Sequence, residues 1–233
     1  MMTSTDVIDA LHQQRSQTTP SVDADPSDTD EQPTQLRMRD LFDVAKAHRD
    51  LPLEEVETLL DHSAYQARLA AVCILDFKAR RAGSRDERRP LYELYLRRHD
   101  RIDTWDMVDR AAPWVVGAYL TGHDLTPLDA LASSSAPLER RTAITAPLYF
   151  IKAGTDTDLS GAFDIADVLA DDPVPVVHNA VGIFIKHAGR RDPARHRTFL
   201  NAHAATMARP ALRLAILKLE PAERRRYLDA RHT

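Results

Sequence analysis

The chain has 233 residues, of which 43 % are apolar, so it is long enough and apolar enough to bury a hydrophobic core. It has no apolar run near the roughly 18 residues that a membrane span requires. Its N-terminus also lacks the basic start and the short apolar stretch of a secretory signal. The single cysteine, Cys73, has no partner with which to form a disulfide. We therefore expect a globular protein of the reducing cytoplasm with no membrane partner.

Charge is distributed unevenly along the sequence, although the formal net charge is only −4. Residues 1–35 hold seven acidic residues against Arg15 alone, whereas the chain from Val177 onward holds twelve Lys or Arg against four acidic residues. The basic surface is therefore expected toward the C-terminus, where it would suit a polyanionic partner.

The first 35 residues are expected to form an acidic, largely disordered tail. Between Ser16 and Gln35 the sequence is mostly Ser, Thr, Asp, Gln and Pro, which cannot bury enough apolar surface to offset the entropy of ordering. Asp6 to Gln14 is compatible with a turn or two of amphipathic helix, but we count it with the tail. The folded domain is then expected over residues 36–233.

The remainder of the sequence has apolar residues at helical spacing and no convincing strand pattern. Pro127, Pro137, Pro193 and Pro221 fall at first-turn positions of predicted helices, whereas Pro113 and Pro147 lie inside helical patterns and predict kinks. The predicted helices cover residues 37–49, 53–62, 64–80, 85–99, 104–121, 125–133, 137–152, 158–170, 174–188, 193–206, 209–219 and 221–230.

Several of these helices resemble one another, with a polar residue followed by small and branched apolar residues. The segments begin at Arg68, Asp109, Arg141, Asn179 and Arg213, with spacings of 41, 32, 38 and 34 residues. A period of this length is typical of stacked HEAT-like helix pairs. We expect an all-α fold, a right-handed α-solenoid whose concave basic face carries these five side chains. Alternatively, such arginines join adjacent repeats through salt bridges and contact nothing outside the protein.

One pair of residues suggests chemistry. Trp105 and Asp109 are four residues apart and therefore share a helical face, which brings an aromatic plane beside a carboxylate and suits a cationic ligand. The motifs Trp105-Asp-Met-Val-Asp109, Glu139-Arg-Arg-Thr-Ala-Ile144, Asn179-Ala-Val-Gly182, His187-Ala-Gly-Arg-Arg-Asp192 and Arg213-Leu-Ala-Ile216 occur in that order. Together they resemble the DNA alkylation repair glycosylases of the AlkD type, over about residues 38–228.

This resemblance implies excision of cationic N3- or N7-alkylated purines from duplex DNA by hydrolysis of the N-glycosidic bond. Asp109 would be the catalytic carboxylate that stabilises positive charge developing on the sugar. Trp105 would pack against the deoxyribose beside the lesion, and Arg141 would bind the phosphates. Other DNA contacts are expected from the polar residues of the repeats and the basic C-terminal part: Arg68, Asn179, Lys186, Arg190 and Arg213.

One position departs from the family pattern. The family's characterised members carry a second tryptophan just after the Ala-Val-Gly segment, where this chain has Ile183, which we place next to the lesion. Two other readings therefore remain open: a non-catalytic HEAT-like binder of damaged or distorted DNA, and a protein-interaction scaffold. No nucleotide-binding or zinc-binding motif is present, so we expect no metal and no cofactor. We also expect the protein to be a monomer.

Overall fold

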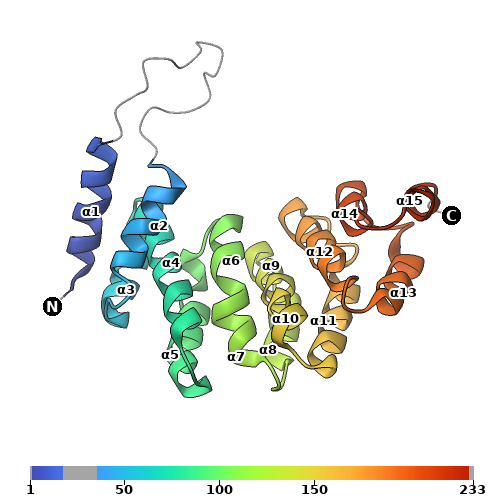
Figure 1. The fold of residues 1–233 in the computed structure, drawn as a ribbon, viewed down its shortest axis with the longest axis horizontal. Helices are drawn as coiled ribbons and strands as arrows, with labels where there is room; N and C mark the ends of the chain where they lie inside the picture. The colour runs from blue at the N-terminus through green and yellow to red at the C-terminus, as the bar shows by residue number, and fades with distance from the viewer. Residues whose placement is uncertain (1, 18–35, 231–233) are drawn as a thin grey trace, which may run out of the picture. The chain divides into compact units, whose positions relative to one another are not determined.

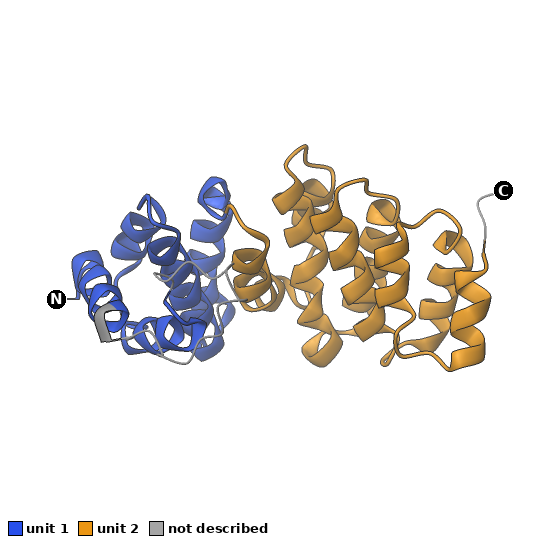
Figure 2. Cartoon of the chain, turned by 90° about the horizontal axis from the view of Figure 1, so that it is seen from above, with its two compact units in different colours: residues 1–102 blue, residues 103–233 orange. Residues whose placement is uncertain are grey.

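The computed structural model describes residues 2–17 and 36–230, and every regular element among these residues is helical. The prediction of an all-α fold is confirmed for this part of the chain. The chain divides into two compact units, residues 1–102 and 103–233 (Figure 2). Among the described residues, no helix combines the length and the apolar character that crossing a bilayer would require.

The first unit is built around one buried helix. α4 is buried continuously from Leu69 to Asp76 and includes the free thiol of Cys73. The neighbouring helices of the unit pack on it and leave their polar faces to solvent. The helices of this unit are α1 (Ser4–Gln17), α2 (Met38–Ala47), α3 (Leu53–Leu60), α4 (Tyr65–Arg81) and α5 (Arg85–Arg97), followed by a 3₁₀ turn at His99–Arg101.

The N-terminal helix α1 corrects the expectation of a tail that extends to residue 35. Val7 and Leu11 are buried against α2, α3 and α4, and the backbone N–H of Ser4 donates to Oε2 of Glu55 at 2.7 Å. Two buried apolar side chains in a polar stretch give only a weak sequence signal for such a helix. Residues 18–35, the rest of the expected tail, lie outside the described residues.

The second unit consists of two rows of helices (Figure 1). In one row α6, α9, α12 and α14 pack successively against one another, and α8, α11 and α13 form the other row. The helices are α6 (Trp105–Ala112), α7 (Ala118–Leu120), α8 (Thr126–Ala132), α9 (Pro137–Thr145), α10 (Phe150–Ala153), α11 (Asp156–Leu169), α12 (Pro175–Ala188), α13 (Pro193–His203), α14 (Arg209–Ala215) and α15 (Pro221–Leu228).

Proline determines several of the helix boundaries in this unit. Pro137, Pro193 and Pro221 each begin a helix, and Pro127 lies in the first turn of α8, as the sequence predicts. At the two prolines for which kinks are predicted the α-helical pattern is interrupted, by a π-helical turn over Pro113–Gly117 and by a 3₁₀ turn over Ala146–Leu148. A proline inside a helix has no N–H to donate to the preceding turn, so the hydrogen-bond ladder changes its spacing there.

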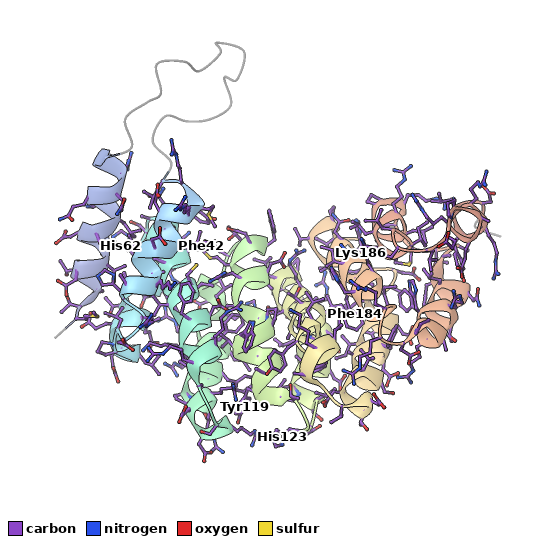
Figure 3. All side chains as sticks on the ribbon, in the orientation of Figure 1. Phe42, His62, Tyr119, His123, Phe184 and Lys186 are labelled. Carbon is purple, nitrogen blue, oxygen red and sulfur yellow. The ribbon has the colours of Figure 1, made fainter. Side chains whose placement is uncertain are left out.

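The core of the second unit lies between its two rows. The rings of Phe163 on α11 and Phe184 on α12 meet edge to face with their centroids 5.6 Å apart, and Phe184 is fully buried (Figure 3). Nε of Arg140 on α9 forms an ion pair at 2.6 Å with Asp172, which lies in the turn between α11 and α12. Apolar packing and this partly buried ion pair together fix the row that carries the candidate site.

Candidate functional site

Four polar side chains occupy the same position in four successive helices of one row. The fifth residue of each helix is polar. These residues are Asp109 in α6, Arg141 in α9, Asn179 in α12 and Arg213 in α14. Equal positions in neighbouring helices point to the same side of the row. The equivalence that the repeat spacing predicts for these four residues is therefore confirmed.

All four residues line one groove with a volume of about 650 Å³. Trp105 and Ile183, the two residues expected next to a bound base, also line it. The remaining lining residues are apolar and were not anticipated, because such side chains at helical spacing are more often core: Pro175, Val176, Pro210, Leu214 and Leu217. The groove thus has a small polar centre within an apolar wall.

Trp105 and Asp109 both reach solvent from α6. Trp105 is the first residue of the helix and is 55 % exposed, an unusual value for a large apolar side chain. Asp109 lies one turn further along the same face, and its side chain is 34 % exposed. The indole and the carboxylate therefore lie side by side at the groove, open to a ligand, rather than sealed between helices.

Arg141 contacts both residues of this pair. Its Nε donates to Oδ1 of Asp109 at 2.9 Å and its Nη2 to Oδ2 at 2.6 Å, while Nη1 donates to the backbone oxygen of Val176 on α12. The guanidinium carbon also lies 5.7 Å from the centre of the Trp105 ring. The two parallel hydrogen bonds from the guanidinium to Asp109, together with the third to Val176, fix the orientation of the carboxylate.

The position of Arg141 differs from the one that the resemblance implies. Its side chain is only 5 % exposed, and Nε, Nη1 and Nη2 all donate within the protein. A guanidinium buried in this way is not free to bind a phosphate. Here Arg141 is a positioning residue that joins α6, α9 and α12 and presents Asp109 to the groove.

The carboxylate of Asp109 retains the capacity to interact with a ligand. An ionised carboxylate has about four acceptor positions, and Arg141 occupies one on each oxygen. The remaining acceptor positions belong to a side chain that is about one-third exposed to solvent. The arrangement can therefore hold a water molecule, or face a developing positive charge, without breaking the ion pair.

Asn179 and Ile183 form the wall contributed by α12, and both are half-buried. Between them, Gly182 allows α14 to approach closely, because a Cβ atom there would lie 2.4 Å from the backbone oxygen of Ala211 and 3.0 Å from Cβ of Leu214. The Asn-Ala-Val-Gly motif thus has a structural function as well as a place in the groove. The opposite wall carries the exposed Arg213 on α14 and Leu217 in the turn that follows this helix, the latter 46 % exposed.

Lys186 and Arg190 do not line the groove. They lie at the C-terminal end of α12 and just beyond it, further along the helix from Ile183, and Arg190 is exposed. His187 between them has a pKa below its ordinary value, because burial disfavours its charged form and because the cations Lys186, Arg190 and Lys218 repel a further charge. These residues form a separate basic cluster.

Arg68 does not occupy the position of the other repeat residues. It is the fourth residue of α4, whereas Asp109, Arg141, Asn179 and Arg213 are each the fifth residue of their helices. Arg68 corresponds instead to Arg140 and His178. Each of these three side chains bonds a backbone oxygen six residues earlier, at 3.0, 2.9 and 3.2 Å. Arg68 thus bonds the turn between α3 and α4, which is neither a place at the groove nor the salt bridge between adjacent repeats that the alternative describes.

Among the residues that the structure describes, no three His, Cys, Asp or Glu side chains are grouped so that they could hold a metal ion.

A family model described as "DNA alkylation repair enzyme" matches residues 32–219, which is most of the chain and includes the whole groove. Neither the comparison with curated proteins nor the comparison with solved structures gave a match.

Proposed function

Because the chain belongs to the DNA alkylation repair enzyme family, we propose that it is a DNA glycosylase that excises cationic N3- or N7-alkylated purines from duplex DNA. The observation that carries this proposal is the exposed Trp105 beside the Arg141-oriented carboxylate of Asp109. We further propose that the stacked helix pairs form a right-handed HEAT-like solenoid, and that the protein acts as a cytoplasmic monomer without metal or cofactor.

The chemistry suits a fixed carboxylate. Alkylation at N3 or N7 places a positive charge on the purine, so the base leaves as a neutral molecule when the bond between C1′ and the purine nitrogen breaks. Positive charge then develops on the deoxyribose. Asp109 faces this charge with an anion whose orientation is already set, which is the most effective form of electrostatic stabilisation. Water adds its hydroxyl to C1′, and its proton passes to Asp109 or to solvent.

Trp105 supports the same reaction by contact. An indole face attracts a cation and also packs against the apolar edge of a sugar, and aromatic contacts of this kind contribute about 0.5–2 kcal/mol. Because the groove is open rather than enclosed, we propose that the lesion is contacted at the surface of the duplex. The exposed Arg213 supplies a phosphate contact on the α14 side, and Asn179 a polar contact on α12.

The decisive variant is Asp109→Asn, measured by release of 7-methylguanine from methylated duplex DNA. The intact protein should release the base, and the variant should lose about 100-fold or more of the rate while retaining duplex affinity. Asp106→Asn is the matched control, since Asp106 lies in the first turn of the same helix but does not line the groove. Circular dichroism of both variants separates loss of chemistry from loss of fold.

One observation favours a second candidate. Ile183 stands in the groove wall where the sequence resemblance leads us to expect a tryptophan, which removes half of the aromatic surface around the lesion. A family member with a weakened cradle would bind alkylated or distorted duplex without cutting it. Salt-sensitive duplex binding with no base release by the intact protein would favour this candidate over the glycosylase.

A further inference from the structure

The first unit contains a cavity that is lined only by its own residues. This cavity has a volume of about 340 Å³ and forms where the turn between α2 and α3, the end of α4 and the first half of α5 meet. Sites for small molecules have volumes of about 300–1,000 Å³. Part of the lining is apolar, with Leu53 from α3 and Pro90 and Leu91 from α5. The remaining lining residues are mainly charged.

Three basic side chains line the cavity and share one nearby carboxylate. Nη1 of Arg81 donates to Oδ1 of Asp50 at 2.7 Å, and Nε of Arg49 lies 4.0 Å from Oδ2 of the same group. Lys78 precedes Arg81 by three residues in the last turn of α4, so both share a helical face. In the described part of the chain, Lys78 has neither a hydrogen bond nor an ion pair, and Arg49 has no hydrogen bond.

The burial of Lys78 distinguishes it from an ordinary surface lysine. A cation in the last turn of a helix is favourable by itself, but Lys78 is also half-buried. Burial lowers the pKa of its amine, Asp50 opposes this effect, and Arg81 adds to it by repulsion. The other acid of the lining, Glu87, accepts from the backbone N–H of Gly83 at 2.8 Å. An anion in the cavity would therefore stabilise a cation that is only partly compensated.

We propose that this cavity binds a small phosphate monoester, with the phosphate between Lys78, Arg49 and Arg81. The organic part of the ligand lies on Leu53 and Pro90. A phosphate monoester carries a charge of about −1.5 to −2 and has three terminal oxygens, which can accept from an ammonium and two guanidinium groups at once. Such a ligand suits three cations that share one carboxylate. The site goes beyond the proposed repair activity and does not depend on it.

The first test compares three ligands by isothermal titration calorimetry of the intact protein. Phenyl phosphate should bind several-fold more tightly than inorganic phosphate, because its ring covers apolar surface of the cavity. Benzoate has the same ring but only one charge and two oxygens, so it should bind about 10–100-fold more weakly than phenyl phosphate. No binding of phenyl phosphate at millimolar concentration would overturn the proposal. Benzoate binding as tight as that of phenyl phosphate would overturn the choice of phosphate.

The second test removes single cations from the cavity. Lys78→Met keeps an unbranched side chain without the charge and should weaken phenyl phosphate binding by about 10–100-fold. Lys46→Met is the matched control, because Lys46 is exposed on α2 and does not line the cavity. Arg49→Gln alters a side chain that is 42 % exposed, so the fold should tolerate it, and it too should weaken binding. Unchanged affinity in the variants at Lys78 and Arg49 would overturn the site.

The last test asks whether the cavity belongs instead to a DNA-binding surface, since duplex DNA also carries phosphates. Fluorescence anisotropy with an undamaged labelled duplex, at constant ionic strength, should give the same affinity with and without saturating phenyl phosphate. Lys78→Met should also bind this duplex as the intact protein does. Competition by phenyl phosphate together with weaker duplex binding by Lys78→Met would overturn the small-molecule site in favour of DNA.

The outcomes for this cavity and for the groove are separable. Release of 7-methylguanine from methylated duplex should be the same in Lys78→Met and in the intact protein. Loss of phenyl phosphate binding with normal base release would remove the cavity proposal alone. An intact protein that binds phenyl phosphate through Lys78 but releases no alkylpurine would remove the glycosylase alone.

Discussion

At the scale of single residues, Arg141 has the most informative placement. The resemblance predicts a phosphate-binding arginine, yet its guanidinium is buried and orients Asp109 and Trp105. Trp105 and Asp109 could be placed together from the sequence, because residues four apart share a helical face whatever the rest of the fold does, and both line the groove. The direction of the Arg141 side chain could not be predicted from the sequence, because it depends on how α6 and α12 pack against α9.

Arg141→Lys tests this positioning role. A lysine keeps the positive charge but cannot hold both oxygens of Asp109 and the Val176 carbonyl at once. We expect the single-turnover rate of base release to fall by about 10–100-fold, with little change in duplex affinity. Arg140→Lys, one residue earlier but facing Asp172, should lower the free energy of unfolding and leave the rate intact. A loss of affinity with an unchanged rate would instead indicate a phosphate contact.

Ile183→Trp tests the incomplete aromatic cradle. An added indole opposite Trp105 should attract a cationic purine by about 0.5–1 kcal/mol. That gain corresponds to a several-fold faster release of 7-methylguanine at subsaturating protein. Ile183→Ala provides the comparison, because it removes apolar contact without adding an aromatic face. Slower release by the tryptophan variant would mean that the apolar wall, not a second indole, fits the lesion in this protein.

At the scale of elements, helix positions were predictable and their exact alignment was not. Pro and polar residues mark the helix starts, so the predicted helices agree with the structure within a few residues over most of the described chain. Arg68 was aligned one residue out of phase, and one residue on a helix turns a side chain by about 100°. That rotation takes Arg68 from the position equivalent to Asp109 to one that bonds the preceding turn.

Gly182→Ala tests the contact between α12 and α14. The new Cβ would lie 2.4 Å from a backbone oxygen of Ala211, so α14 would have to shift, and we expect a loss of about 1–3 kcal/mol in the free energy of unfolding. Gly161→Ala on α11 is the matched control, because its Cβ would meet only the flexible end of Leu125. There the higher helix propensity of alanine should offset most of the cost. Urea denaturation of both variants measures the difference, and equal stability would contradict the close contact.

At the scale of the whole molecule, charge and pH bear on both stability and binding. The pKa of His196 is lowered by burial, and its Nε2 bonds the backbone oxygen of Ala215 across α13 and α14. The pKa of His187 is lowered as well. The unfolded chain therefore binds protons more readily than the folded chain just below the ordinary histidine pKa, so stability is lost as the pH falls through this range.

Urea denaturation between about pH 7 and about pH 5.5 measures this loss. The free energy of unfolding should decrease steadily toward the lower pH in the intact protein. In His196→Gln the decrease should be smaller, whereas replacing the exposed His123 by Gln should leave it unchanged. A pH dependence that is the same in the His196 variant and in the intact protein would contradict the assignment. Below this range, carboxyl groups with lowered pKa values, such as Glu57 beside Arg97 and Arg98, add to the loss.

Hydrolysis at a single alkylated nucleotide by the groove around Asp109 is the central proposal for this protein. The most direct measurement uses a duplex that contains a single 7-methylguanine at a known position, incubated with excess protein and then treated with alkali to cut any abasic site. We predict strand cleavage at that position alone, with free 7-methylguanine recovered in equal amount. An uncut strand under conditions in which the protein is bound to the duplex would contradict the account.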